Sequence, residues 1–293
     1  MAHLVIGVDG SQESTTALTW AAAEAQRQGA ALVIIYGLHM PIVSVPLSGS
    51  VVLPPTDELE KYARNVLDEA AAAATTTAPG LEVRTELELR PPADALLAAS
   101  ADAELVVVGS RGLSSLGSVI LGSVSARVAA GAACPTVVIP ADAAESTGTG
   151  PIVVGIDGSA HSDAALTFAV QRADRLGTTV VAIHAYTLSL TAVPIIDPEL
   201  AERLGQQQRR EAEEVVTEAL ERAGVADRAD LVSSRIVVAN AGEALTEAGS
   251  DAAMTVVGSR GRGGFIGMLL GSVSQAVLHR AHHPVVVVRA ANR

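Results

Sequence analysis

Cysteine and aromatic side chains are nearly missing from this chain of 293 residues. A single cysteine excludes a disulfide framework within the chain and indicates a reducing compartment, for which we predict the cytoplasm. Only 2% of the residues are aromatic whereas 49% are hydrophobic, so the core must be aliphatic. No apolar run approaches the roughly 18 residues of a membrane-spanning helix. Residues 4–8 already read as a strand, so we expect no signal peptide.

Positive charge is also scarce. The chain holds 32 acidic and 20 basic residues, and its net charge of −12 disfavours nucleic acid and anionic membranes as partners. The motif G-x-x-x-x-G-K-[ST] is absent, which excludes a P-loop enzyme. The first strand leads into residues 7–11, GVDGS, and not into G-x-G-x-x-G, which disfavours a dinucleotide dehydrogenase. No general base stands out, so we expect a protein that is not an enzyme.

A pattern of glycines is present and occurs twice. Two residues separate the first two glycines of each copy, and nine residues separate the second glycine from a Gly-Ser pair. The copies are Gly109, Gly112 and Gly122-Ser123, then Gly258, Gly261 and Gly271-Ser272. Each copy follows an apolar run and ends where an amphipathic segment begins. This order of strand, glycine loop and helix start predicts a phosphate site made of backbone N–H groups, although the same glycines would also suit plain tight turns.

The duplication extends over nearly the whole chain. Residues 6–11, IGVDGS, match residues 154–159, VGIDGS. We therefore predict two α/β domains, at 1–141 and 151–293, joined by a small polar linker at 142–150. Strands alternate with helices in each copy, which predicts two doubly wound, five-stranded parallel sheets of the Rossmann-like kind. The predicted strands lie near residues 4–8, 31–36, 83–89, 105–108 and 136–139, and near 152–156, 180–184, 231–238, 254–257 and 285–288.

Ligands of such sheets lie at the carboxyl ends of the strands, where the strand order reverses. Asp9 and Asp157 end the first strands there, and a carboxylate is suited to ribose hydroxyls or a divalent cation. The alternative is a turn aspartate that caps the next helix. Arg111 and Arg260 lie within the glycine loops, where each either neutralises phosphate or is simply solvated. Ser123 and Ser272 stand where helix N-caps belong.

Arg262 occurs in the second copy only, where Leu113 stands in the first, so the two sites are expected to differ. The segment Arg90-Pro91-Pro92 also differs from its counterpart at 239–242, ANAG, and predicts a changed wall in one site. The pair His282-His283 lacks a third ligand with fitting spacing, so it is not predicted to bind metal. Cys134 is expected to be a small buried hydrophobe.

The fifth strands, at 137–139 and 285–288, are apolar and would lie at open sheet edges. An exposed apolar edge invites aggregation. We therefore predict that the two domains pair along these strands about a pseudo-two-fold axis. The apolar loops at 40–55 and 188–198 predict further association, as a homodimer.

Together, the glycine pattern and the upstream strand-Asp turn resemble the universal stress protein family in its tandem form, over essentially the full chain. The resemblance implies ATP, with Mg²⁺ or Mn²⁺, at the carboxyl ends of the first and fourth strands. Asp9 and Asp157 are then possible metal contacts through the triphosphate. The implied ATP-binding residues are Gly7, Asp9, Gly37, Gly109, Ser110, Arg111, Gly112, Leu113, Ser114, Ser115, Gly122, Ser123, Val124 and Ser125, and Gly155, Asp157, Ala185, Gly258, Ser259, Arg260, Gly261, Arg262, Gly263, Gly264, Gly271, Ser272, Val273 and Ser274.

The main hypothesis is a cytoplasmic, ATP-binding stress-response regulator that senses nucleotide and hydrolyses it slowly or not at all. A second hypothesis is an adenylyl-transferring or pyrophosphate-releasing enzyme, for which no acceptor site is apparent. A third is a nucleotide-free scaffold whose apolar faces bind other proteins.

Overall fold

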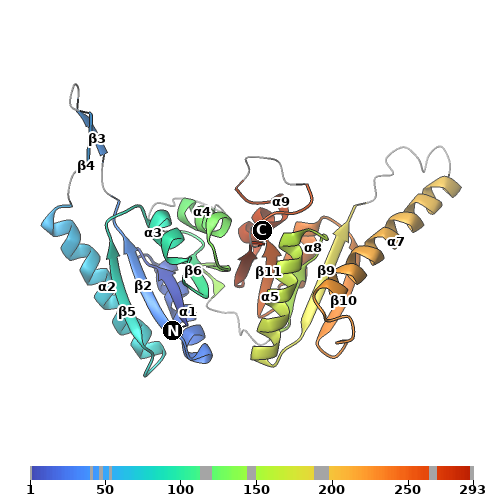
Figure 1. The fold of residues 1–293 in the computed structure, drawn as a ribbon, viewed down its shortest axis with the longest axis horizontal. Coiled ribbons are helices and arrows are strands. Elements are labelled where there is room, and N and C mark those ends of the chain that lie inside the picture. The colour runs from blue at the N-terminus through green and yellow to red at the C-terminus, as the bar shows by residue number, and fades with distance from the viewer. Residues whose placement is uncertain are drawn as a thin grey trace. The chain divides into compact units, whose positions relative to one another are not determined.

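The computed structural model describes residues 2–39, 42–45, 49–52, 55–112, 121–143, 150–187, 198–263 and 269–290. The chain divides into two compact units, unit 1 at Met1–Ala144 and unit 2 at Glu145–Arg293. Each unit is a parallel sheet with helices packed on it (Figure 1). Among the described helices, none has the length and apolar character needed to cross a membrane.

Unit 1 alternates strands and helices along the chain. Its main elements are β1 (His3–Gly7), α1 (Gln12–Gln28), β2 (Ala31–Gly37), α2 (Asp57–Thr77), β5 (Val83–Glu88), α3 (Pro92–Ala99), β6 (Leu105–Gly109), α4 (Ser123–Gly131) and β7 (Thr136–Ile139). The segment at 40–55, which the sequence suggested to be a loop, contains an antiparallel hairpin of β3 (Ile42–Val45) and β4 (Gly49–Val52). That part of the prediction was wrong, because valine-rich stretches favour extended pairing.

The strands of unit 1 are parallel and stand in the order β5-β2-β1-β6-β7. Helices α1 and α2 contact each other, as do α3 and α4. The chain moves outward from β1 through α1 and returns through α3 to β6, and right-handed crossovers therefore put the two helix pairs on opposite faces. The order reverses between β1 and β6, so a crevice is expected at their carboxyl ends.

Unit 2 repeats this plan. Its elements are β8 (Ile152–Gly155), α5 (Ala160–Leu176), β9 (Val180–Tyr186), α7 (Pro198–Arg222), β10 (Val232–Val238), α8 (Ala241–Ala248), β11 (Met254–Gly258), α9 (Ser272–Arg280) and β12 (Val285–Val288). The strand order is β10-β9-β8-β11-β12, again parallel. The predicted pair of five-stranded doubly wound sheets is confirmed, whereas the pseudo-two-fold pairing of the domains stays a prediction.

Local sequence accounts for most of these elements. The apolar runs of β1 and β6 are buried on both faces, as central parallel strands must be. The alternating strand β5 lies at the end of the strand order, and its side chains are exposed or half-buried, so its prediction as an edge strand is confirmed. Helix α1 begins at the side-chain cap of Ser11 and ends at Gly29, whose φ of 63° is left-handed.

The amino-terminal ends of the fourth and fifth strands differ between the units. In unit 2, the buried ring of His283 has its Nε2 atom 2.7 Å from Thr255 Oγ1. An added Cβ at Gly249 would lie 2.4 Å from that ring, so a glycine is needed there. Unit 1 has Val106 and Cys134 at the matching positions. Cys134 is half-buried, and burial raises the pKa of its thiol to about 11, which keeps it protonated and unreactive at neutral pH.

Candidate nucleotide site

Each unit has a cavity at the carboxyl ends of its first and fourth strands. The described residues enclose about 190 Å³ at β1 and β6 in unit 1 and about 350 Å³ at β8 and β11 in unit 2. Both cavities are therefore at the reversal of strand order, where the topology of a doubly wound sheet predicts a ligand.

Asp9 forms the turn that leads from β1 into α1. Its Oδ1 atom accepts hydrogen bonds from the backbone N–H of Ser11, at 3.0 Å, and from the Ser11 hydroxyl, at 2.6 Å. The Ser11 Oγ atom in turn accepts from Ser14 N at 3.1 Å and caps the helix. The aspartate therefore supports the helix start, as the alternative interpretation predicted, and it also lines the cavity.

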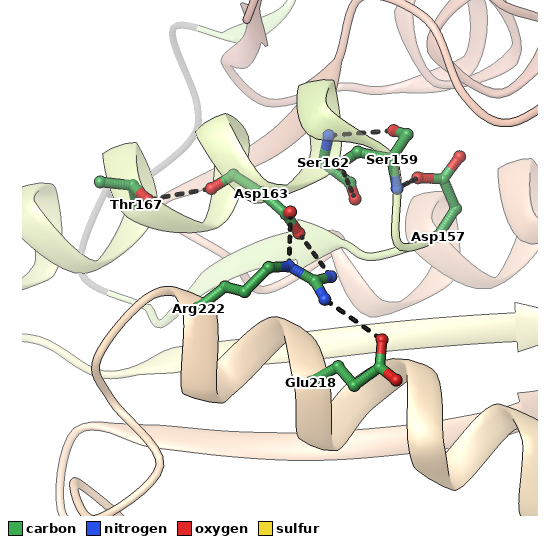
Figure 2. Close-up of polar contacts among 7 residues, drawn as sticks. All are labelled: Asp157, Ser159, Ser162, Asp163, Thr167, Glu218 and Arg222. Carbon is green, nitrogen blue, oxygen red and sulfur yellow. Dashed lines mark hydrogen bonds and ion pairs between the residues drawn. The ribbon is translucent and has the colours of Figure 1, made fainter.

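Asp157 does the same in unit 2, and Figure 2 shows the chain of contacts from Asp157 through Ser159 to Ser162. Its second oxygen, Oδ2, accepts from the backbone N–H of Arg262 at 3.1 Å, which joins the first turn to the glycine loop. Burial raises the pKa of this carboxyl, but hydrogen bonds from Ser159, Ser162 and Arg262 outweigh that and hold the pKa below its usual value. Asp157 is therefore a carboxylate at neutral pH.

The second glycine of each loop lies directly against this carboxylate. A Cβ atom on Gly112 would lie 2.4 Å from Asp9 Oδ2, and one on Gly261 would lie 2.2 Å from Asp157 Oδ2. No side chain fits at those distances. The G-x-x-G spacing is thus explained by the approach of the aspartate as well as by the turn itself.

The first turns of α4 and α9 line the two cavities. Their N-caps are Gly122 and Gly271, which have no side chain to accept from the helix. The predicted caps at Ser123 and Ser272 were wrong, because each serine is already the first helical residue. An uncapped first turn directs backbone N–H groups and the positive end of the helix dipole at the cavity.

A buried serine in each first turn holds the glycine loop in place. Ser125 Oγ donates to the backbone oxygen of Gly109 at 2.6 Å. Ser274 Oγ donates to the oxygen atoms of Gly271 and Ser259, at 2.9 and 3.2 Å. The side-chain hydroxyls of these residues are therefore used inside the protein, and their N–H groups are the parts that suit an anion.

Arginines from the loops complete the polar side of each cavity. Arg111 lines the cavity of unit 1, and Arg260 and Arg262 line that of unit 2. Arg260 also affects the pKa of His161, which lies at the start of α5. Burial, then the charge of Arg260 and of Arg289, lowers the pKa of His161. Its ring accepts a hydrogen bond from Ala290 N at 2.9 Å, which requires the neutral form.

The apolar walls come from helices that sequence reasoning did not assign to the site. Leu96 of α3 packs where a Cβ on Gly7 would be, at 2.7 Å, and Leu245 of α8 does so at Gly155, at 2.8 Å. The backbone of Pro92 would lie 2.4 Å from a Cβ on Gly37. Because these glycines have no side chain, α3 and α8 can pack directly against the ends of the strands. The predicted difference at Pro92 is present, because Ala241 lines the wall in its place in unit 2.

Most of the predicted site residues meet in these two cavities. Ser110 and Ser259 are not among the described residues that line the cavities, and their contact with nucleotide stays a prediction. The backbone of Ser110 bonds to Ile139 and Gly122, and Ser259 is buried with its Oγ atom 3.3 Å from His161 Nδ1. The predicted residues outside the described part of the chain are Leu113, Ser114, Ser115 and Gly264. The predicted residues that line the cavities are Gly7, Asp9, Gly37, Gly109, Arg111, Gly112 and Gly122 to Ser125, and Gly155, Asp157, Ala185, Gly258, Arg260, Gly261, Arg262, Gly263 and Gly271 to Ser274.

Sequence reasoning missed Tyr36, at the end of β2, which lines the cavity of unit 1. Burial, then the neighbouring Tyr62 and Asp9, raises the pKa of its hydroxyl. Its place at the end of a strand that neighbours β1 was the available signal. Within the described residues, no group of three or more histidine, cysteine or acidic side chains is placed to hold a metal ion.

Known proteins resemble this chain in sequence and in fold. The universal stress protein family matches residues 1–140 and 148–289. A universal stress protein of Mycolicibacterium smegmatis is 36% identical over 301 residues, which cover 98% of this chain and 96% of that protein. The crystal structure of a universal stress protein from Archaeoglobus fulgidus covers 99% of this chain and 98% of its own, with a TM-score of 0.69 and 21% identity, and shows the shared fold.

A solved universal stress protein in complex with cAMP covers 48% of this chain and 97% of its own, with 27% identity and a TM-score of 0.36. The family match extends over both units of this chain, and the Mycolicibacterium smegmatis relative spans nearly its full length. The protein therefore belongs to the universal stress protein family and carries two copies of the family's domain.

Proposed function

We propose that each unit binds an adenine nucleotide, ATP foremost, and that the protein is a nucleotide-sensing regulator of the stress response. One observation carries this proposal. In both units an uncapped helix start, a glycine loop with an arginine, and a strand-end aspartate converge on the same cavity. Membership of the family supports the role in stress.

The polar side of each cavity suits the phosphates. The first-turn N–H groups of Ser123, Val124 and Ser125, and of their counterparts in α9, are donors that need no deprotonation and approach an anion closely. The arginine beside them adds a full positive charge, which a chain of net charge −12 needs locally if it is to attract a nucleotide.

The apolar side suits the adenosine. Leu96 with Ile35, and Leu245 with Ile183, give each cavity an aliphatic wall at the strand ends. Ala185 is a small residue in the lining of unit 2, so a base can approach the backbone there, and Gly37 with Pro92 lines the corresponding place in unit 1. The aspartates bear carboxylate oxygens that suit ribose hydroxyls or, together with the phosphates, a single Mg²⁺ or Mn²⁺ ion.

We further propose that the protein works by binding and not by turnover. A carboxylate whose oxygens already accept backbone N–H groups, as those of Asp157 do, is a weak general base. We expect hydrolysis to be slow, and the consequence of binding to be a change in what the protein contacts.

The first experiment identifies what the purified protein carries. The protein, prepared without added nucleotide, is denatured, and the released molecules are identified by chromatography and mass spectrometry. Titration calorimetry with Mg-ATP then gives the number of sites. We expect two per chain, and one after Val124→Trp or Val273→Trp, each of which fills one cavity. Release of nothing, together with no heat on titration, would contradict the proposal and leave the scaffold hypothesis.

A further inference from the structure

We propose that the two cavities prefer different nucleotides, with a nucleoside triphosphate in unit 2 and a nucleotide with fewer phosphates in unit 1. This inference rests on the proposed function. It comes from differences between two sites that share one backbone plan, so each unit is the reference for the other.

The first difference is Arg262. Its guanidinium lies over the turn between β8 and α5, where a Cβ on Gly158 would be 2.0 Å from Nη2 and 2.8 Å from Cζ. Its backbone N–H is held by Asp157 Oδ2 at 3.1 Å. Gly158 has a φ of +75°, so glycine suits this position in conformation as well as in size. The arginine is therefore placed at the rim of the cavity that it lines.

The corresponding place in unit 1 holds neutral groups. A Cβ on Gly10, the counterpart of Gly158, would lie 3.3 Å from the Tyr62 hydroxyl and 3.3 Å from a methyl group of Val66, both on α2. The residue that aligns with Arg262 is Leu113, which lies outside the described residues. No cation from the described part of unit 1 faces this turn in the way that Arg262 faces Gly158.

The charge balance of the linings follows. Two arginines and one aspartate line the cavity of unit 2, whereas the described lining of unit 1 has one arginine and one aspartate. Each further phosphate brings more negative charge to the loop, and the extra cation stabilises that charge in unit 2 alone.

The volumes of the two cavities also favour the longer nucleotide in unit 2, whose cavity is the larger. The cavity of about 350 Å³ in unit 2 falls within the range of about 300 to 1,000 Å³ for small-molecule sites, and that of about 190 Å³ in unit 1 falls below it. Pro92, whose backbone packs on Gly37, and the ring of Tyr36 line the smaller cavity. The counterpart of Pro92 is Ala241, which lines the larger cavity. The counterpart of Tyr36 is His184, whose Nδ1 atom lies 2.7 Å from the backbone oxygen of Ile156.

The test measures ATP and AMP binding at one site at a time in the full chain. Val124→Trp fills the cavity of unit 1, so that only the site of unit 2 can bind nucleotide. Val273→Trp fills the cavity of unit 2, so that only the site of unit 1 can bind nucleotide. We expect the ratio of ATP affinity to AMP affinity to be at least tenfold higher at the site of unit 2. Arg262→Leu in the Val124→Trp protein should lower ATP affinity by about tenfold and leave AMP affinity within about threefold, because only the longer phosphate chain reaches the added charge.

Arg280→Leu is the matched control. It removes the same charge from the last turn of α9, where the exposed Arg280 pairs with Glu243, outside the lining. If a tryptophan variant does not fold, Arg262→Leu and Arg280→Leu are compared in the wild-type chain, where only the former should weaken one of two ATP sites.

The outcomes separate the two proposals. An absence of ATP and AMP binding at both sites would overturn the proposed function itself. Binding at both sites with equal ATP-to-AMP ratios, or equal effects of Arg262→Leu and Arg280→Leu, would overturn the difference between the sites and leave the proposed function intact.

Discussion

Acid should destabilise unit 2 through His283. The ring is 4% exposed and lies against Thr255, and burial, with a smaller effect from the charge of His282, lowers its pKa to about 4. The unfolded chain restores a pKa of about 6.5. Between these two values the unfolded state binds more protons than the folded state, so the free energy of unfolding falls as the pH falls.

The size of the effect follows from the two pKa values. The stabilisation by the neutral, buried ring is fully present above about pH 6.5 and is lost progressively down to about pH 4. One pKa unit corresponds to about 1.4 kcal/mol, so the difference between a pKa of about 6.5 and one of about 4 gives about 3 kcal/mol in total, of which about 2 kcal/mol is lost between pH 7 and pH 5. Such a loss is a large part of the stability of a typical domain.

His283→Cys, which installs the residue that unit 1 has at Cys134, should remove this pH dependence. Hydrogen exchange of the amides of β11 and β12 reports the stability of unit 2, while the fluorescence of Trp20, the only tryptophan, reports unit 1. The substitution also removes packing atoms, so the slope against pH, and not the stability at pH 7, is the quantity to compare. His282→Gln, at the exposed neighbour, should keep most of the wild-type slope, because burial of His283 is the larger cause of its lowered pKa.

Two results would refute this reasoning. One is a pH slope in His283→Cys equal to that of the wild type. The other is an equal loss of stability in both units on acidification, since unit 1 has no buried histidine at the matching position.

Two further predictions concern the cavity of unit 2. Gly261→Ala should weaken one of the two proposed ATP sites at least tenfold in calorimetry, because the new Cβ would lie 2.2 Å from Asp157 Oδ2. Gly205→Ala is the control and should not weaken ATP binding, because Gly205 lies in α7 with open space around it. Equal ATP affinities in the two variants would argue against the role of the carboxylate. Leu245→Ala removes a side chain that is 2% exposed and should cost about 2 to 4 kcal/mol by hydrogen exchange of unit 2. Leu269→Ala, at a side chain that is 63% exposed, should change it by less than about 0.5 kcal/mol, and a cost at Leu245 no larger than that would contradict the packing seen at Gly155.

The start and end of the site's elements could be read from local sequence. Buried parallel strands need continuous apolar runs, so β1, β6, β8 and β11 were predictable within one or two residues. Repetition of the glycine spacing in both halves pointed to the same loop in both units. The position of the crevice then followed from topology alone, since consecutive right-handed crossovers leave few arrangements open.

Contacts between distant segments were not predictable in this way. Nothing near Gly112 in sequence indicates that Asp9 lies against it, and the caps at Ser123 and Ser272 were misplaced because a glycine can occupy the same position. The walls from Leu96 and Leu245 came from helices whose own patterns look like ordinary core packing.

The sequence by itself therefore determined the duplicated α/β plan and the glycine loops, because periodicity and turn chemistry act over neighbouring residues. Only the tertiary structure decided which groups share a cavity. Arg262 over Gly158 in unit 2, and Tyr62 beside Gly10 in unit 1, are the two examples. Their partners are brought together by packing between elements that lie far apart in the chain, and that packing depends on the shape of the whole unit.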